Sequence, residues 1–269
     1  MPNISNNGTS FEIHGKDEKP CVILIHGLGL NKEIWQWLVP TLEKTYHIIT
    51  FDLYGHGDSI NPPETPSLSL FSKQINGLLK KINKTKASLI GFSLGGMICR
   101  RFAQDYPEKT ESLIILNSPY KRSQDAQDAI LGRLAQLKSN GPEATVEDAL
   151  VRWFSDKYRS KNSELLSVVR KWVMKNDPKI YPKIYEVLAT GLVEITSPFP
   201  NISCPTLVIT ADEDFGNGPE MAYAIAKEIP KSEVLILKGL RHMALAEAPE
   251  AVNKPIKKFL TEVTRIAGS

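Results

Sequence analysis

Several features that mark specialised proteins are scarce in this 269-residue chain. Its three cysteines, Cys21, Cys99 and Cys204, have no metal-ligand spacing, and their odd number argues against a disulfide framework. The formal charge is only +3 and no block of Lys or Arg occurs, so neither nucleic acid nor a membrane surface is an expected partner. No apolar run is long enough to span a membrane, and the first ten residues are polar rather than signal-like. These absences predict a cytoplasmic protein.

What the chain does contain is a regular alternation of short apolar runs and amphipathic stretches. Near-continuous apolar runs, typical of parallel strands buried on both faces, cover Cys21–Gly27, His47–Asp52, Ala87–Phe92, Ser112–Asn117, Thr206–Ala211 and Glu233–Leu237. Helical periodicity covers Lys32–Lys44, Leu68–Asn83, Leu94–Tyr106, Pro219–Ile229 and Ala246–Val263. The alternation predicts an α/β fold: a mostly parallel sheet with helices on both faces and an antiparallel edge strand at Ser10–His14.

The alternation stops between residues 120 and 200. This stretch has helical character, no convincing strand, and a group of aromatic residues: Trp153, Phe154, Tyr158, Trp172, Tyr181 and Tyr185. We therefore expect residues 120–200 to form an inserted helical cap. The core would then consist of residues 1–119 and 201–269, with the cap over the carboxyl edge of its sheet.

The hexapeptide Gly91-Phe92-Ser93-Leu94-Gly95-Gly96 lies between a predicted strand and a predicted helix. In that setting Gly-x-Ser-x-Gly indicates a nucleophile elbow, which holds the serine in a strained turn at the end of a sheet. Gly91 and Gly95 would let the strand and the helix approach closely enough to form the turn. Ser93 is therefore the candidate nucleophile.

A serine nucleophile needs a base, an acid that orients the base, and donors for an oxyanion. His242 follows the last apolar run and is the candidate base, whereas the other four histidines are expected to be structural. Asp214 follows the run before it and is the candidate acid, with Asp212 as the alternative. Along the chain the three residues come in the order Ser, Asp, His, which is the order of catalytic triads built on a parallel sheet with a nucleophile elbow. The backbone N–H groups of Leu94 and Leu28 are the expected oxyanion donors.

Motifs along most of the chain resemble those of the α/β-hydrolase superfamily. They are His26-Gly27-x-Gly29 with Trp35, Asp52-x-x-Gly55-x-Gly57-x-Ser59, the Ser93 hexapeptide, Cys204-Pro205-Thr206-Leu207, Asp214, and His242 with Glu247-x-Pro249-Glu250. Within the superfamily the chain resembles single-domain bacterial hydrolases such as 3-oxoadipate enol-lactonases, small carboxylesterases and cofactor-free perhydrolases, which the motifs do not distinguish. Haloalkane dehalogenases and epoxide hydrolases have Asp at the position of Ser93, so their alkyl-enzyme mechanism is not expected here. Carbon–carbon bond hydrolases commonly have Asn and Trp where this chain has Phe92 and Met243, which argues against that group.

The resemblance implies a serine hydrolase that cleaves a small carboxylic ester or lactone through an acyl-enzyme, without metal or organic cofactor. Alternatives are a small-molecule receptor on a hydrolase fold, a perhydrolase or a carbon–carbon bond hydrolase. Trp153, Arg133, Arg152 and Met243 are the candidate substrate contacts. Either arginine could pair with a carboxylate such as that of an enol-lactone, although a solvated side chain is the simpler interpretation. The sequence is compatible with a homo-oligomer.

Overall fold

The computed structural model describes residues 2–196 and 202–267, and the expected end of the cap at residue 200 lies outside them. An eight-stranded sheet forms the centre, in the order β1-β2-β4-β3-β5-β6-β7-β8. All neighbouring strands from β4 onward are parallel, and β2 is antiparallel to both β1 and β4. The strands are β1 Asn3–Ile4, β2 Ser10–His14, β3 Cys21–Ile25, β4 His47–Phe51, β5 Ala87–Phe92, β6 Thr110–Leu116, β7 Thr206–Ala211 and β8 Ser232–Leu237.

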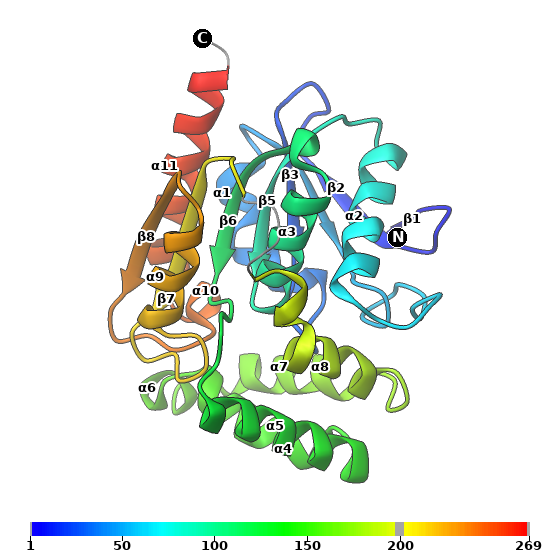
Figure 1. Cartoon of the computed structure of the whole chain (residues 1–269), viewed down its shortest axis with the longest axis vertical. Coiled ribbons are helices and arrows are strands. Elements are labelled where there is room, and N and C mark those ends of the chain that lie inside the picture. Colours follow the sequence, from blue (N-terminus) through cyan, green and yellow to red (C-terminus); the bar gives the residue numbers. More distant parts are fainter. Residues whose placement is uncertain (1, 197–201, 268–269) are drawn as a thin grey trace.

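Helices cover both faces of the sheet, which confirms the predicted α/β class (Figure 1). One face carries α2 (Leu68–Lys81), α3 (Leu94–Asp105) and α9 (Pro219–Glu228). The other carries η1 (Lys32–Trp37), α1 (Val39–Leu42), α10 (Ala244–Glu247) and α11 (Pro249–Ala267). Strand β3 is buried along its whole length, and alternate side chains enter the two cores, Ile23 on one face and Leu24 on the other. Continuous apolar strands thus follow from burial on both sides.

The segment between β6 and β7 is helical. It contains α4 (Gln124–Asn140), α5 (Glu143–Trp153), α6 (Asp156–Arg159), α7 (Ser163–Met174), α8 (Tyr181–Thr190) and η3 (Gly191–Glu194), and its described residues include no strand. In Figure 1 these helices lie together at the foot of the view, beyond the carboxyl ends of β6 and β8. This position is the one expected of a cap, while the domain boundaries at 119/120 and 200/201 remain predictions.

Three local expectations were wrong, two of them because of proline. The helix expected over Lys32–Lys44 is split into η1 and α1, because Pro40 lacks the N–H that a continuous helix would use. The helix expected over Ala246–Val263 is broken at Ala248, the residue before Pro249. Strand β2 is antiparallel as predicted, but β1 pairs with its outer side, so β2 is not the edge strand.

None of the described helices is sufficiently long and apolar to cross a bilayer.

Candidate active site

Five loops meet at one edge of the sheet because parallel strands end on the same side. They follow β3, β5, β6, β7 and β8 and carry Leu28, Ser93, Asn117, Asp214 and His242, respectively. The chain leaves β3 toward β4 on one side and reaches β5 on the other, so the strand order reverses between β3 and β5. Such a switch point is where open α/β sheets bind ligands.

Ser93 has the strained backbone that the sequence predicts. Its φ of 55° and ψ of −114° lie in a backbone region that residues other than glycine rarely adopt. A Cβ at Gly91 would collide with the Gly95 carbonyl, and a Cβ at Gly95 would collide with the Ile25 carbonyl. The backbone N–H of Ser93 donates to the Leu116 carbonyl at 2.8 Å, which fixes the turn against β6. The two glycines therefore allow the close approach that holds the serine out from α3.

His242 and Asp214 form a buried pair. The Nδ1 atom of His242 lies 2.7 Å from Oδ2 of Asp214, and both residues are less than 10 % exposed. With the proton on Nδ1, the ring donates to the carboxylate and keeps Nε2 as its acceptor. Asp212, the alternative acid, instead accepts from the Gly239 N–H at 2.8 Å and lies 3.5 Å from Lys238. The geometry therefore pairs the histidine with Asp214.

Four groups hydrogen-bond to the Asp214 carboxylate. Besides His242, Oδ2 accepts from the Asn117 amide at 2.9 Å, and Oδ1 accepts from the N–H groups of Gly216 and Asn217 at 3.1 Å each. Burial alone would raise the pKa of Asp214, but the charge and hydrogen bond of His242, with those of Asn117 and Gly216, hold it below its ordinary value. The carboxylate is therefore ionised and fixed in orientation at neutral pH.

The two expected oxyanion donors occupy positions that suit the role. Leu94 is the first residue of α3, so its N–H has no partner within the helix. In the described part of the chain, neither the Leu94 nor the Leu28 N–H donates to a protein acceptor. Both residues are buried, at 0 % and 7 % exposure. An unpaired N–H at such a depth is costly, and a bound oxygen atom would satisfy it.

A cavity of about 200 Å³ lies between these residues and the helical segment that connects β6 and β7. Ser93, Asp214, His242 and Leu28 line its sheet side. Of the four candidate substrate contacts, Trp153, Arg133 and Arg152 line it and Met243 does not. The Met243 side chain is fully buried among core residues, while its backbone N–H donates to the Trp153 carbonyl at 2.9 Å. Apolar residues contribute much of the remaining lining, among them Ile130, Val146, Ala149, Val173 and Leu188.

The two histidines near this edge that were expected to be structural are hydrogen-bonded to loops. The Nε2 atom of His26 accepts from the Leu53 N–H and that of His56 accepts from the Gly29 N–H, each at 3.0 Å. Burial, together with the nearby His26, lowers the pKa of His56 to about 3. Burial also lowers the pKa of His26. Both rings are therefore neutral supports of the Gly27–Leu30 loop, as the sequence predicts.

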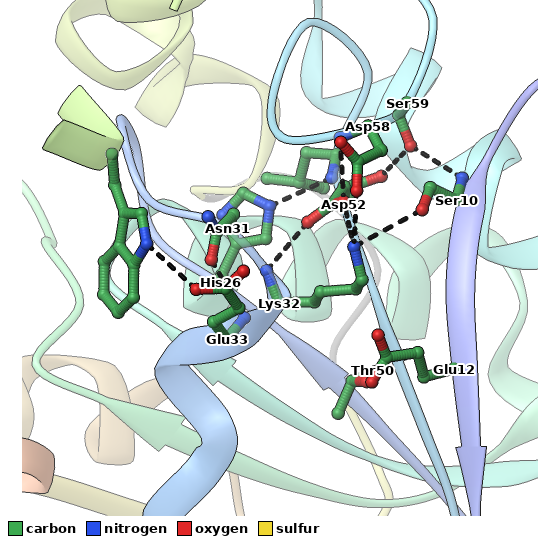
Figure 2. Close-up of polar contacts among 12 residues, drawn as sticks. Ser10, Glu12, His26, Asn31, Lys32, Glu33, Thr50, Asp52, Asp58 and Ser59 are labelled. Carbon is green, nitrogen blue, oxygen red and sulfur yellow. Dashed lines mark hydrogen bonds and ion pairs between the residues drawn. The ribbon is translucent and has the colours of Figure 1, made fainter. Parts of the chain in front are cut away.

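A second polar cluster connects the segments that follow β3 and β4 (Figure 2). The ammonium group of Lys32, at the start of η1, lies 2.8 Å from Asp52 and 3.2 Å from Asp58. Asp52 also accepts from the Lys32 backbone N–H at 2.8 Å and from the Asp58 N–H at 3.0 Å. Lys32 is only 7 % exposed and Asp52 is fully buried. The cluster ties the turn after β4 to the residues that follow the oxyanion loop.

Several residues of the site were not predicted from the sequence, among them Asn117, Arg122 and Tyr185. Asn117 binds Asp214, and its positive φ of 47° at the end of β6 places the amide there. Arg122 and Tyr185 line the cavity. An Asn after a predicted strand was a usable signal, since Asn tolerates that backbone conformation. Nothing local to Arg122 or Tyr185 reveals that they face one cavity.

Within the described residues, no three His, Cys, Asp or Glu side chains are grouped closely enough to hold a metal.

Comparison with known proteins gives hydrolases as relatives. The (E)-2-((N-methylformamido)methylene)succinate hydrolase of Acinetobacter baylyi is 28% identical over 96% of this chain and 96% of its own length. The 3-oxoadipate enol-lactonase 1 of the same organism is 27% identical over 76% of this chain and 75% of its own length.

Solved structures share the fold over nearly the whole chain. The enol-lactonase from Burkholderia xenovorans superimposes with a TM-score of 0.86 at 24% identity, covering 95% of this chain and 98% of that one. An esterase from Thermogutta terrifontis gives a TM-score of 0.85 at 25% identity, covering 95% and 93%. The family model described as the alpha/beta hydrolase fold matches residues 20–249. The chain therefore belongs to the α/β-hydrolase family of enzymes.

Proposed function

We propose that the protein is a serine hydrolase that cleaves a small carboxylic ester or enol-lactone through an acyl-enzyme on Ser93. The observation that carries the proposal is the 2.7 Å contact between His242 and Asp214, in a cavity that Ser93 also lines from a strained elbow. The relatives named as an enol-lactonase and a methylenesuccinate hydrolase support a small carboxylic acid derivative as the substrate.

Acylation begins when the Ser93 hydroxyl oxygen attacks the carbonyl carbon of the substrate. Nε2 of His242 takes the hydroxyl proton, and Asp214 stabilises the resulting imidazolium through its bond to Nδ1. The carbonyl oxygen becomes an oxyanion, which accepts hydrogen bonds from the Leu28 and Leu94 N–H groups. When the tetrahedral intermediate collapses, the carbon–oxygen bond to the leaving group breaks and the leaving oxygen receives the proton from Nε2.

Deacylation repeats these steps with water as the nucleophile. Nε2 of His242 removes a proton from water, the hydroxide adds to the acyl carbon, and the bond to the Ser93 oxygen breaks. The proton returns to Ser93 and the free carboxylic acid leaves. Loss of one oxyanion donor in comparable sites costs about 3–4 kcal/mol of transition-state stabilisation. The backbone positions of Leu28 and Leu94 are therefore as important for catalysis as the catalytic side chains.

The test is hydrolysis of p-nitrophenyl acetate by the wild-type protein and by Ser93→Ala. We expect the variant to lose turnover by a factor of about 10⁶, because the nucleophile acts as one unit with its base. A fluorophosphonate probe should label Ser93 in the wild type and leave Ser93→Ala unlabelled. Ser118, a buried serine near the same edge, provides the matched control, since Ser118→Ala should retain activity and labelling. Turnover retained in Ser93→Ala would refute the proposal.

A further inference from the structure

Three arginines of the segment between β6 and β7 line the cavity: Arg122 before α4, Arg133 on α4 and Arg152 on α5. In the described part of the chain, none of them has a carboxylate within 4.0 Å. The two other arginines of this segment differ, since Arg159 lies 2.7 Å from Asp156 and Arg170 lies 2.5 Å from Glu147. Among the described arginines of this segment, those that line the cavity therefore lack an acidic partner and the other two have one.

The hydrogen bonds that these arginines make leave donors available. The two terminal nitrogens of Arg122 donate to the carbonyls of Leu188 and Ala189 in the last turn of α8, at 3.0 and 3.2 Å. Nε of Arg133 lies 3.4 Å from the hydroxyl of Tyr185, also on α8. A guanidinium group has five N–H donors, so even Arg122 keeps more than half of its own for a ligand.

The charge of the cavity lining is strongly unbalanced. Three guanidinium groups face one carboxylate, Asp214, which leaves a formal charge of +2 when His242 is neutral. Burial, together with the charge of Arg133, lowers the pKa of Arg122 to about 10. Burial and the charge of Arg133 act in the same direction on the pKa of Arg152. The arginines therefore repel one another in a partly buried space, an arrangement that a bound anion would relieve.

We propose that the cavity binds a dianion: the substrate carries two free carboxylates besides the ester or lactone bond that is cut. This inference rests on the proposed function for the reaction, but the binding that it describes stands on the arginines alone. Two carboxylates would neutralise the formal charge of +2, and a planar carboxylate matches the paired donors of a guanidinium group. The Tyr185 hydroxyl, which accepts from Arg133, can donate its own proton to the same carboxylate.

The kinetic test compares three p-nitrophenyl esters that differ in charge. The 4-methylpentanoate is neutral, the hydrogen succinate has nearly the same shape with one carboxylate, and the monoester of tricarballylate has two. We expect kcat/KM of the wild type to rise in that order, by about 10- to 100-fold for each carboxylate, as charge-assisted hydrogen bonds are added. Most of the gain should lie in KM, and it should shrink as salt is added.

Variants then assign the preference to the arginines. In Arg133→Gln and Arg152→Gln, kcat/KM for the tricarballylate ester should fall at least ten times more than that for the neutral ester. Arg152→Lys should restore part of the preference because it restores the charge. Arg170→Gln is the matched control, a partly exposed arginine of the same segment that does not line the cavity, and it should alter neither value. Equal losses on all three esters would indicate a structural role and overturn the inference.

Binding to the Ser93→Ala protein separates this inference from the proposed function. Calorimetric titration with methylsuccinate, which keeps only the two free carboxylates of the tricarballylate ester, should show one site, which Arg152→Gln weakens and Arg170→Gln does not. If no ester is hydrolysed but methylsuccinate binds in this way, the proposed reaction fails and the dianion site stands. If esters are hydrolysed but methylsuccinate binds no better than acetate, the dianion site fails alone. Tighter binding of inorganic phosphate than of methylsuccinate would also overturn the inference.

Discussion

The Lys32 cluster and the cavity arginines both place positive charge inside the fold, but they differ in their counter-charges. Lys32 is buried with Asp52 at 2.8 Å and Asp58 at 3.2 Å (Figure 2). The cavity arginines have no carboxylate at such distances among the described residues, although Arg159 and Arg170 of the same segment do. A buried charge without a counter-charge is costly, and a bound anion would offset that cost at the cavity arginines.

The comparison separates residues that support the site from residues that act in it. The Lys32 cluster and the neutral rings of His26 and His56 hold the loop that carries the Leu28 N–H, with their polar atoms paired inside the protein. The arginines, the acceptor nitrogen of His242 and the two oxyanion donors are the groups left for a substrate. Substitutions in the first set should therefore change stability, and substitutions in the second should change catalysis.

The largest effect on catalysis short of removing Ser93 is expected from Asp214→Asn. An amide at this position would leave Nδ1 of His242 without its anionic acceptor and favour the wrong tautomer, so kcat should fall about 10⁴-fold. Steady-state hydrolysis of p-nitrophenyl acetate measures this change. Asp212→Asn is the matched control and should stay within a few-fold of the wild type; a larger loss there than in Asp214→Asn would move the acid role to Asp212.

The largest effect on stability is expected from Asp52→Asn. This change leaves the Lys32 ammonium group buried with half of its ion pairing removed, which should lower the free energy of unfolding by about 3–5 kcal/mol. Urea denaturation followed by circular dichroism measures it. Asp58, which binds the same ammonium group but is half exposed, is the control, and Asp58→Asn should cost no more than about 1 kcal/mol. Equal costs would contradict the role given to burial.

A smaller effect on catalysis is expected from Asn117→Gly. Glycine accepts the positive φ at this position, so the change removes the amide that binds Asp214 without adding backbone strain. Loss of one hydrogen bond to a charged group should lower kcat about 10- to 100-fold. Because that bond helps to keep the pKa of Asp214 low, activity should also begin to fall at a higher pH as the solution is acidified. An unchanged pH profile would show that Asn117 does not tune the carboxylate.

The smallest effect concerns the pH dependence of stability. His56 has a pKa of about 3 in the folded protein and about 6.5 when unfolded, so the unfolded chain binds a proton that the folded one does not between these values. The contribution of neutral His56 to the free energy of unfolding is complete above pH 6.5 and is lost as the pH falls, by about 2 kcal/mol between pH 7 and pH 5. Denaturation of the wild type and of His56→Gln at both pH values should differ by that amount. Parallel losses in the two proteins would contradict it.

The strands and the elbow could be predicted from sequence because their signals are local. Burial on both faces makes the inner parallel strands continuous apolar runs, although the edge strand β8 is partly exposed. Gly91 and Gly95 mark the close approach around Ser93. Positions just past the strands, such as His26, Asp52 and Asn117, were predicted as strand ends but lie in the loops. The helix breaks at Pro40 and Pro249 were also readable, since proline restricts both its own position and the preceding one.

The cavity wall could not be predicted in the same way. Arg122, Arg133 and Arg152 come together through the packing of α4 against α5 and α8, which depends on contacts distant in sequence. A single arginine in a helical segment has the same local pattern whether it pairs with an acid, as Arg170 does, or faces a cavity. For Met243 the local position beside His242 was misleading, because the next residues turn its side chain into the core.

The most direct measurement of the account is to locate the acyl group during turnover. The wild-type protein is mixed with p-nitrophenyl hydrogen succinate, quenched in acid within the first turnover, digested and mapped by mass spectrometry. We predict a succinyl ester on Ser93, formed with a burst of p-nitrophenolate and absent from the Ser93→Ala protein. A burst with the acyl group on another residue, or steady hydrolysis by Ser93→Ala at the wild-type rate, would contradict it.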